Sequence, residues 1–146
     1  MKIIKIVLLA AVAVMAVSCC SCRKNNSTTG GTRHSASLTG TTWQLVEIDG
    51  TKFKASGDSF TLILADDGKV SGKGDCNRMM GSYTKNDAGM LTFGRLAGTM
   101  IYCPNQADED KFLVTIETID SYAIDGDMLA LSSGGSTRMV FRKVVQ

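Results

Sequence analysis

Short apolar runs separated by turn-forming residues are the feature of this sequence that most restricts its fold. They recur at intervals of about ten residues throughout residues 38–146. The run at 60–65 ends at an Asp-Asp-Gly turn signal, and a later run ends at Asp125 and Gly126. Asp, Asn and Gly tolerate the positive φ angles that tight hairpin turns require. The pattern therefore predicts an antiparallel β protein built from successive hairpins.

One segment, residues 103–122, breaks this pattern and has the spacing of a helix. Pro104 and Asn105 are typical of a helix start. Large apolar residues then follow at helical spacing, and they are Phe112, Leu113, Ile116 and Ile119. We predict a mainly β (α+β) fold, in which a strongly curved antiparallel sheet or open barrel has one amphipathic helix packed across it.

Three consecutive acidic residues, Asp108, Glu109 and Asp110, lie in or near the first turn of the predicted helix. Adjacent residues on a helix point in different directions, so the trio is a poor metal site. Carboxylates at this end are stabilised by the helix dipole, and we interpret the trio in that way. The aspartates at the turns lack the spacing of a calcium loop, so we expect no bound metal.

The N-terminus has the parts of a bacterial lipoprotein signal peptide, residues 1–18. Lys2 and Lys5 precede an unbroken apolar run that is too short for a comfortable membrane span and ends in small residues. Small residues before a cysteine resemble a lipobox, in which that cysteine is diacylated and becomes the first mature residue. We predict lipidation, including palmitate-type acylation, at Cys19, with Cys20 as the alternative.

Acylation would attach the protein to a membrane without threading it through. Each buried methylene contributes about 0.8 kcal/mol, and more than one chain makes attachment effectively permanent. Loss of Lys2 and Lys5 with the signal peptide lowers the 16 basic residues to 14, equal to the 14 acidic ones. A neutral extracytoplasmic domain gives no reason to expect nucleic-acid binding. We expect a cell-envelope protein that faces the periplasm, on the outer membrane rather than the inner.

Residues 19–37 differ in composition from the rest of the chain. They are rich in Ser, Thr, Asn and Gly, which predicts a flexible tether. The tether contains Cys22, whose state stays open, and His34, the only histidine of the chain. Residues 38–146 are long enough for one compact domain with a single core, but not for two.

The domain resembles the META domain family, which includes the bacterial heat-shock lipoprotein HslJ and the Leishmania META proteins. The resemblance rests on the motifs GTTWQL, GDCNRMMGSY, LTFGRLAGTMIYC and LALSSGGSTRMVF, in that order. Two departures are Asp75 where the family commonly has Gly, and Ile101-Tyr102 where it commonly has Met-Ala-like residues.

The resemblance implies a function without implying a mechanism. No enzymatic activity or cofactor is established for META domains as a class, and members are linked to envelope stress, heat shock or virulence. We therefore expect no enzyme and no cofactor, but a monomeric protein acting in the envelope stress response or in assembly by binding an envelope protein. The alternative function is a carrier of a small apolar ligand or lipid. A thiol-redox enzyme is a third interpretation.

Cys76 lies among polar residues, as a catalytic nucleophile often does, but the chain offers it no suitable base. His34 is outside the domain, and Cys76 and Cys103 supply only two of the four ligands of a structural zinc site. No serine stands in a Gly-x-Ser-x-Gly motif. Export would place both thiols in an oxidising compartment, and they are the only cysteines of the domain. We predict a Cys76–Cys103 disulfide.

Three polar residues near this cysteine, Asn77, Arg78 and Tyr83, form a possible recognition surface. In the simpler interpretation Asn77 supports a turn, Arg78 is solvated and Tyr83 packs in the core. A methionine-rich groove for a peptide or lipid is a further hypothesis, against which we expect ordinary core packing. The candidate residues of such a groove are Met79, Met80, Met90 and Met100.

Overall fold

The computed structural model describes residues 35–145. The predicted signal peptide, the lipidation sites Cys19 and Cys20, Cys22 and His34 lie outside the described residues, so these predictions stay untested. No helix among residues 35–145 is long and apolar enough to cross a membrane.

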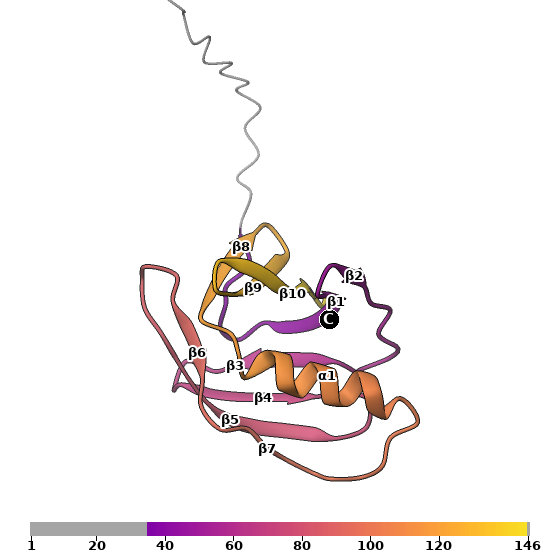
Figure 1. The fold of residues 1–146 in the computed structure, drawn as a ribbon. Helices are drawn as coiled ribbons and strands as arrows, with labels where there is room; N and C mark the ends of the chain where they lie inside the picture. The colour runs from indigo at the N-terminus through magenta and orange to yellow at the C-terminus, as the bar shows by residue number, and fades with distance from the viewer. Residues whose placement is uncertain (1–34, 146) are drawn as a thin grey trace, which may run out of the picture. The chain divides into compact units, whose positions relative to one another are not determined.

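The described chain folds into ten strands and one helix (Figure 1). The strands are β1 (Thr42–Ile48), β2 (Thr51–Lys52), β3 (Thr61–Leu64), β4 (Lys69–Lys73), β5 (Arg78–Lys85), β6 (Leu91–Phe93), β7 (Ala97–Gly98), β8 (Ser121–Asp125), β9 (Met128–Ser133) and β10 (Ser136–Lys143). The helix, α1, spans Gln106–Ile116 and connects β7 to β8.

The strands form a nearly closed antiparallel barrel. Their order is β6-β5-β4-β3-β1-β10-β9-β8, with β2 paired to β1 and β7 paired to β5. The two outer strands of this order, β6 and β8, approach each other at a single bridge between Met90 and Ser121, and the backbone N–H of Leu91 donates to the carbonyl of Asp120 at 3.1 Å. One seam therefore stays unsealed, which confirms the prediction of a curved antiparallel sheet or open barrel.

The first strand shows how this sequence directs side chains into the core. Trp43 and Leu45 are buried, and strict alternation would place Glu47 beside them. The register with β10 shifts between Leu45 and Glu47, a β-bulge that turns Glu47 away and buries Ile48 instead. The strand then reverses at Asp49 and Gly50, whose φ angles of 49° and 74° suit a two-residue hairpin turn.

Helix α1 packs on the sheet through the predicted apolar stripe. Phe112 and Ile116 are fully buried, Ile119 is buried just beyond the helix end, and Leu113 is half-buried. The Phe112 ring makes edge-to-face contacts with Phe60 at 5.6 Å and with Phe141 at 6.3 Å between centroids. The helix thus covers the core across which it lies in Figure 1.

Asp49 forms an ion-pair network that joins the β1–β2 turn to β10 and α1. Its carboxylate accepts a hydrogen bond from Arg138 Nε at 2.6 Å and lies 3.2 Å from Lys111 Nζ. Mainly because of the Arg138 hydrogen bond, with Lys111 adding to it, the pKa of Asp49 is below its usual value of 3.8.

This network predicts a contribution to stability that depends on pH. Because the folded protein holds the carboxylate ionised, the contribution is complete above the ordinary Asp pKa and is lost as pH falls through the lower folded value. Replacing Asp49 with Asn should cost about 0.2–1 kcal/mol at neutral pH, in the range of exposed ion pairs, and less at about pH 3. Urea unfolding of both proteins across this pH range measures the difference. A difference that grows on acidification would contradict the assignment.

Candidate functional site

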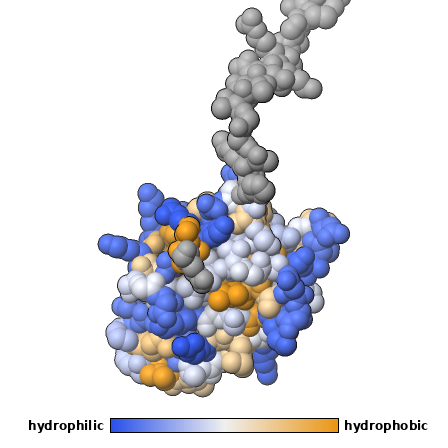
Figure 2. All heavy atoms as spheres, turned by 180° about the vertical axis from the view of Figure 1, so that it is seen from behind, coloured by the Kyte–Doolittle hydropathy of each residue, from blue (hydrophilic) through white to orange (hydrophobic). Residues whose placement is uncertain are grey.

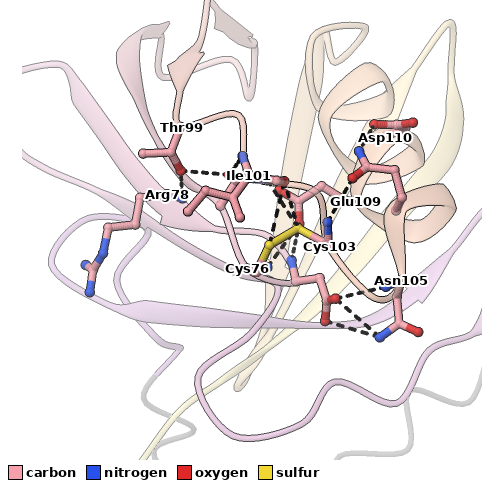
Figure 3. Close-up of a disulfide and its surroundings, with 11 residues drawn as sticks. Cys76, Arg78, Thr99, Ile101, Cys103, Asn105, Glu109 and Asp110 are labelled. Atoms are coloured by element: carbon pink, nitrogen blue, oxygen red, sulfur yellow. Dashed lines mark hydrogen bonds between the residues drawn. A yellow bond between two sulfur atoms is a disulfide. The ribbon is translucent and has the colours of Figure 1, made fainter.

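A disulfide joins Cys76 and Cys103, as predicted from the sequence (Figure 3). Cys76 lies in the loop between β4 and β5, and Cys103 lies three residues before α1, with Cα atoms 5.7 Å apart. Cys103 is fully buried and Cys76 is half-buried. The bond therefore ties the loop after β4 to the segment that leads into the helix. A thiol-redox enzyme would need one of these sulfurs to be free.

Asn77, next to the disulfide, holds the segment before α1 through its side-chain amide. Its Oδ1 accepts hydrogen bonds from the Thr99 hydroxyl and the Ile101 backbone N–H, both at 2.8 Å. Its Nδ2 donates to the Ile101 carbonyl at 2.8 Å and to Cys103 Sγ at 3.2 Å. The side chain is buried and its hydrogen-bonding groups are occupied. Asn77 is therefore a structural clamp on residues 99–103.

The hypothesis of a recognition surface formed by Asn77, Arg78 and Tyr83 is corrected by these positions. Tyr83 is buried, and its hydroxyl donates to the carbonyl of Ala65 at 2.6 Å. Burial, more than the nearby aspartates, raises the pKa of Tyr83, so the phenol stays neutral. Arg78 is exposed, and its guanidinium points away from the disulfide in Figure 3. Only Arg78 can face a partner, because the folded chain needs the other two side chains inside.

Glu109, on the first turn of α1, is a buried acidic residue with a structural partner. It is 1% exposed, and its Oε2 accepts hydrogen bonds from the backbone N–H groups of Asp75 and, at 3.2 Å, Cys76. The same oxygen lies 3.5 Å from Cys103 Sγ. The other oxygen, Oε1, is buried without a hydrogen-bond partner in the described part of the chain. The carboxylate thus lies against the disulfide, between the helix and the β4–β5 loop.

In the sequence, Glu109 was not distinguished from its acidic neighbours. Asp108 and Asp110 are exposed, as expected of residues at the positive end of a helix, but Glu109 points inward. A signal was present in the spacing, because Glu109 precedes Phe112 and Ile116 by three and seven positions and so shares their face of the helix. The inward carboxylate also requires Gly74, since a Cβ there would lie 2.5 Å from both of its oxygens.

Three consecutive large side chains of the segment that Asn77 holds are exposed to solvent. Met100, Ile101 and Tyr102 are 98%, 62% and 85% exposed. We call residues 99–102 the apolar loop. Asn77 holds this loop through the Thr99 hydroxyl and the Ile101 backbone, and the disulfide at Cys103 holds its end. It is therefore a preformed apolar projection.

A hollow of about 300 Å³ lies between the apolar loop and α1. Its walls combine apolar side chains with acidic and amide groups, and its lining residues are Asn77, Thr99, Met100, Ile101, Tyr102, Gln106, Glu109, Asp110 and Leu113. None of these residues is basic. We call this feature the loop–helix hollow.

Only one of the four candidate methionines packs in the core, although we expected core packing for all of them. Met79 is buried, but Met80, Met90 and Met100 are 64%, 54% and 98% exposed. They line three different surface hollows, so they do not form one methionine-rich groove. On the face seen from behind in Figure 2, apolar side chains form separate small patches among hydrophilic ones.

Comparison with known proteins identifies the family of this fold and site. A sequence profile of the META domain matches residues 36–146, which include the whole barrel, the disulfide and the loop–helix hollow. The chain belongs to the META domain family. The matched region of this META protein begins two residues before the predicted start at residue 38, and Ala36 is buried in the core.

Solved structures similar to this META protein share its fold. One is the NMR structure of a protein from Burkholderia xenovorans, with 27% identity, a TM-score of 0.58, and coverage of 75% of this chain and 85% of that one. Another is the crystal structure of a DUF4847 family protein from Bacteroides vulgatus ATCC 8482, with 14% identity, a TM-score of 0.57, and coverage of 75% and 96%. No protein of curated function matches the chain.

The described part of this META protein offers no set of metal ligands. Within residues 35–145, no three His, Cys, Asp or Glu side chains are placed together to hold an ion. Both domain cysteines are bonded to each other. What the site presents instead is a rigid apolar loop beside an acidic, half-enclosed hollow, an arrangement that suits binding.

Proposed function

We propose that this META-domain protein is a lipid-anchored binding protein of the cell envelope that acts without catalysis. The observation that carries the proposal is the exposure of Met100, Ile101 and Tyr102 on a fixed loop. Large apolar side chains that remain in water together are typical of an interaction site. A loop already held in one conformation loses little further entropy when a partner binds, which favours affinity.

The proposed setting follows from the N-terminal sequence and the family. Cys19, or alternatively Cys20, would carry the acyl chains and hold the domain on the periplasmic side of a membrane, the outer rather than the inner. The family resemblance favours an accessory of the stress response or of envelope assembly, and we expect it to be a monomer. The partner would be another envelope protein.

The alternative function, a carrier of an apolar ligand or lipid, is less well supported by the interior of the barrel. A carrier needs an apolar cavity, but the barrel is filled by fully buried side chains, which include Trp43, Leu62, Phe112, Leu129 and Phe141. A bound lipid would have to displace this core. We therefore favour binding at the surface.

Metabolic labelling with an alkyne fatty acid tests the anchor. The full-length protein should become labelled and should fractionate with membranes, and replacing Cys19 with Ala should abolish both. Cys20→Ala is the matched control, and the reverse result would move lipidation to Cys20. Persistence of label in the double variant would contradict the proposed anchor.

Photo-crosslinking in intact cells tests binding. A photoreactive amino acid placed at Tyr102 should yield a discrete adduct with one envelope protein, because Tyr102 is exposed and projects from the apolar loop. Other exposed positions, at Met90 and Arg142, provide comparison sites on different parts of the barrel. Absence of a specific adduct from all three positions would contradict a protein-binding function.

A further inference from the structure

We propose that the loop–helix hollow binds a cationic side chain, lysine or arginine, that a partner protein presents next to an apolar residue. This inference rests on the proposed binding function and specifies the chemistry of the partner. Three features of the hollow carry it: a buried carboxylate among its lining residues, an excess of acidic over basic groups, and an apolar wall.

The buried carboxylate is that of Glu109. Glu109 lines the hollow and is 1% exposed, and Oε1 has no hydrogen-bond partner in the described chain. Both backbone N–H groups that reach this carboxylate bind Oε2. A buried carboxylate without a cationic partner places its negative charge in a low-dielectric surrounding, so it attracts a cation in the hollow more strongly than a solvated carboxylate does. The side chain that this charge favours is a cationic one.

The charges around the hollow also select a cation. Asp110 lines it, and its Oδ1 accepts a single hydrogen bond from the Gln106 amide at 2.7 Å. Among the described residues, the two basic groups closest in sequence to its lining do not neutralise it. Lys111 pairs with Asp49 at 3.2 Å, and the Arg78 guanidinium points away in Figure 3. Unlike charges attract and like charges repel, so an acidic peptide or a phosphate would be rejected.

The apolar wall of the hollow favours a ligand that has an apolar part beside its cationic group. Met100, Ile101, Tyr102 and Leu113 surround the acidic groups, and the first three are largely in water. The stem of lysine or arginine can lie along such side chains, and the Tyr102 ring can add a cation–π contact. A neighbouring aliphatic residue of the ligand would cover Met100. The hollow, of about 300 Å³, suits one or two side chains and is at the lower limit for a small-molecule pocket.

Selection from a display library of short random peptides tests this inference. The bait is the full-length protein in detergent. Enriched peptides should pair Lys or Arg with an adjacent apolar residue, and their binding should weaken at high ionic strength because the charges become screened. Replacing the cationic residue of a selected peptide with Gln should reduce its affinity about tenfold.

Matched variants then locate the binding site. Met100→Ser should weaken a selected peptide about tenfold, whereas Met90→Ser, at another exposed methionine, should leave its affinity unchanged. Asp110→Asn should weaken it about fivefold at low ionic strength, whereas Asp87→Asn removes the same charge from a remote turn and should have no effect. These four positions are exposed, so the variants are expected to fold.

Three outcomes would overturn the inference. In the first, the selected peptides lack basic residues. In the second, their affinity is insensitive to Met100→Ser and Asp110→Asn. In the third, a free polyamine binds as tightly as a peptide, which would make the apolar wall irrelevant. Such results would leave the proposed function intact if photo-crosslinking at Met90 or Arg142 still captured a specific partner. Loss of crosslinks at every position would instead contradict the proposed function itself.

Discussion

Replacing Cys76 and Cys103 together with alanine is expected to lower the free energy of unfolding by about 3.5 kcal/mol. The bond joins residues separated by 27 positions, so its loss frees a long loop in the unfolded chain. In the folded protein, Asn77 and Glu109 still hold the two segments, so the variant should fold and its barrel should be retained. Urea denaturation, with equal slopes for the two proteins, measures the change.

Reduction of the wild-type protein is the control for this prediction. Dithiothreitol should destabilise the wild type by a similar amount and should leave the double alanine variant unaffected. Mass spectrometry after alkylation without reduction should find no modified Cys76 or Cys103. Alkylation of both residues in the native protein would show that the bond is absent and would contradict the prediction.

The fold was predictable because its main signals are local. Turn residues such as Asp49 and Gly50 specify hairpins, and the stripe of Phe112 and Ile116 specifies a helix that must bury one face. The β-bulge after Leu45 was not predictable, because the alternation of β1 alone would place Glu47 in the core. Its position depends on pairing with β10, which lies far away in the sequence.

The disulfide was also predictable, but its surroundings were not. Only two domain cysteines are available to pair, so no geometry was needed to propose the bond. Asn77 and Glu109 act through partners that are 22 to 34 positions away, and no local pattern indicates such distant hydrogen bonds. Exposure of the apolar loop has the same origin, because Asn77 fixes the backbone that turns Met100 and Tyr102 outward.

The contact between Gly74 and Glu109 gives the second large prediction. A Cβ at Gly74 would lie 2.5 Å from both carboxylate oxygens and 2.6 Å from Cδ. Glu109 cannot withdraw without leaving the partly buried N–H groups of Asp75 and Cys76 without this partner. Gly74→Ala should therefore destabilise the protein by about 3 kcal/mol, as overpacking of a core does. Gly94→Ala is the control, since its Cβ meets the hydroxyl of exposed Ser82, which can rotate away.

A double-mutant cycle distinguishes this contact from a general weakness of the region. Glu109→Ala alone should cost about 3 kcal/mol, because it leaves two backbone donors unsatisfied and a void behind. With the carboxylate gone, the Gly74→Ala methyl no longer meets an obstacle, so the double variant should be about as stable as Glu109→Ala alone. The two single losses should thus exceed the combined loss by about 2 kcal/mol or more, measured by urea unfolding. Simple additivity would mean that Gly74 is required for another reason and that Glu109 does not lie against it.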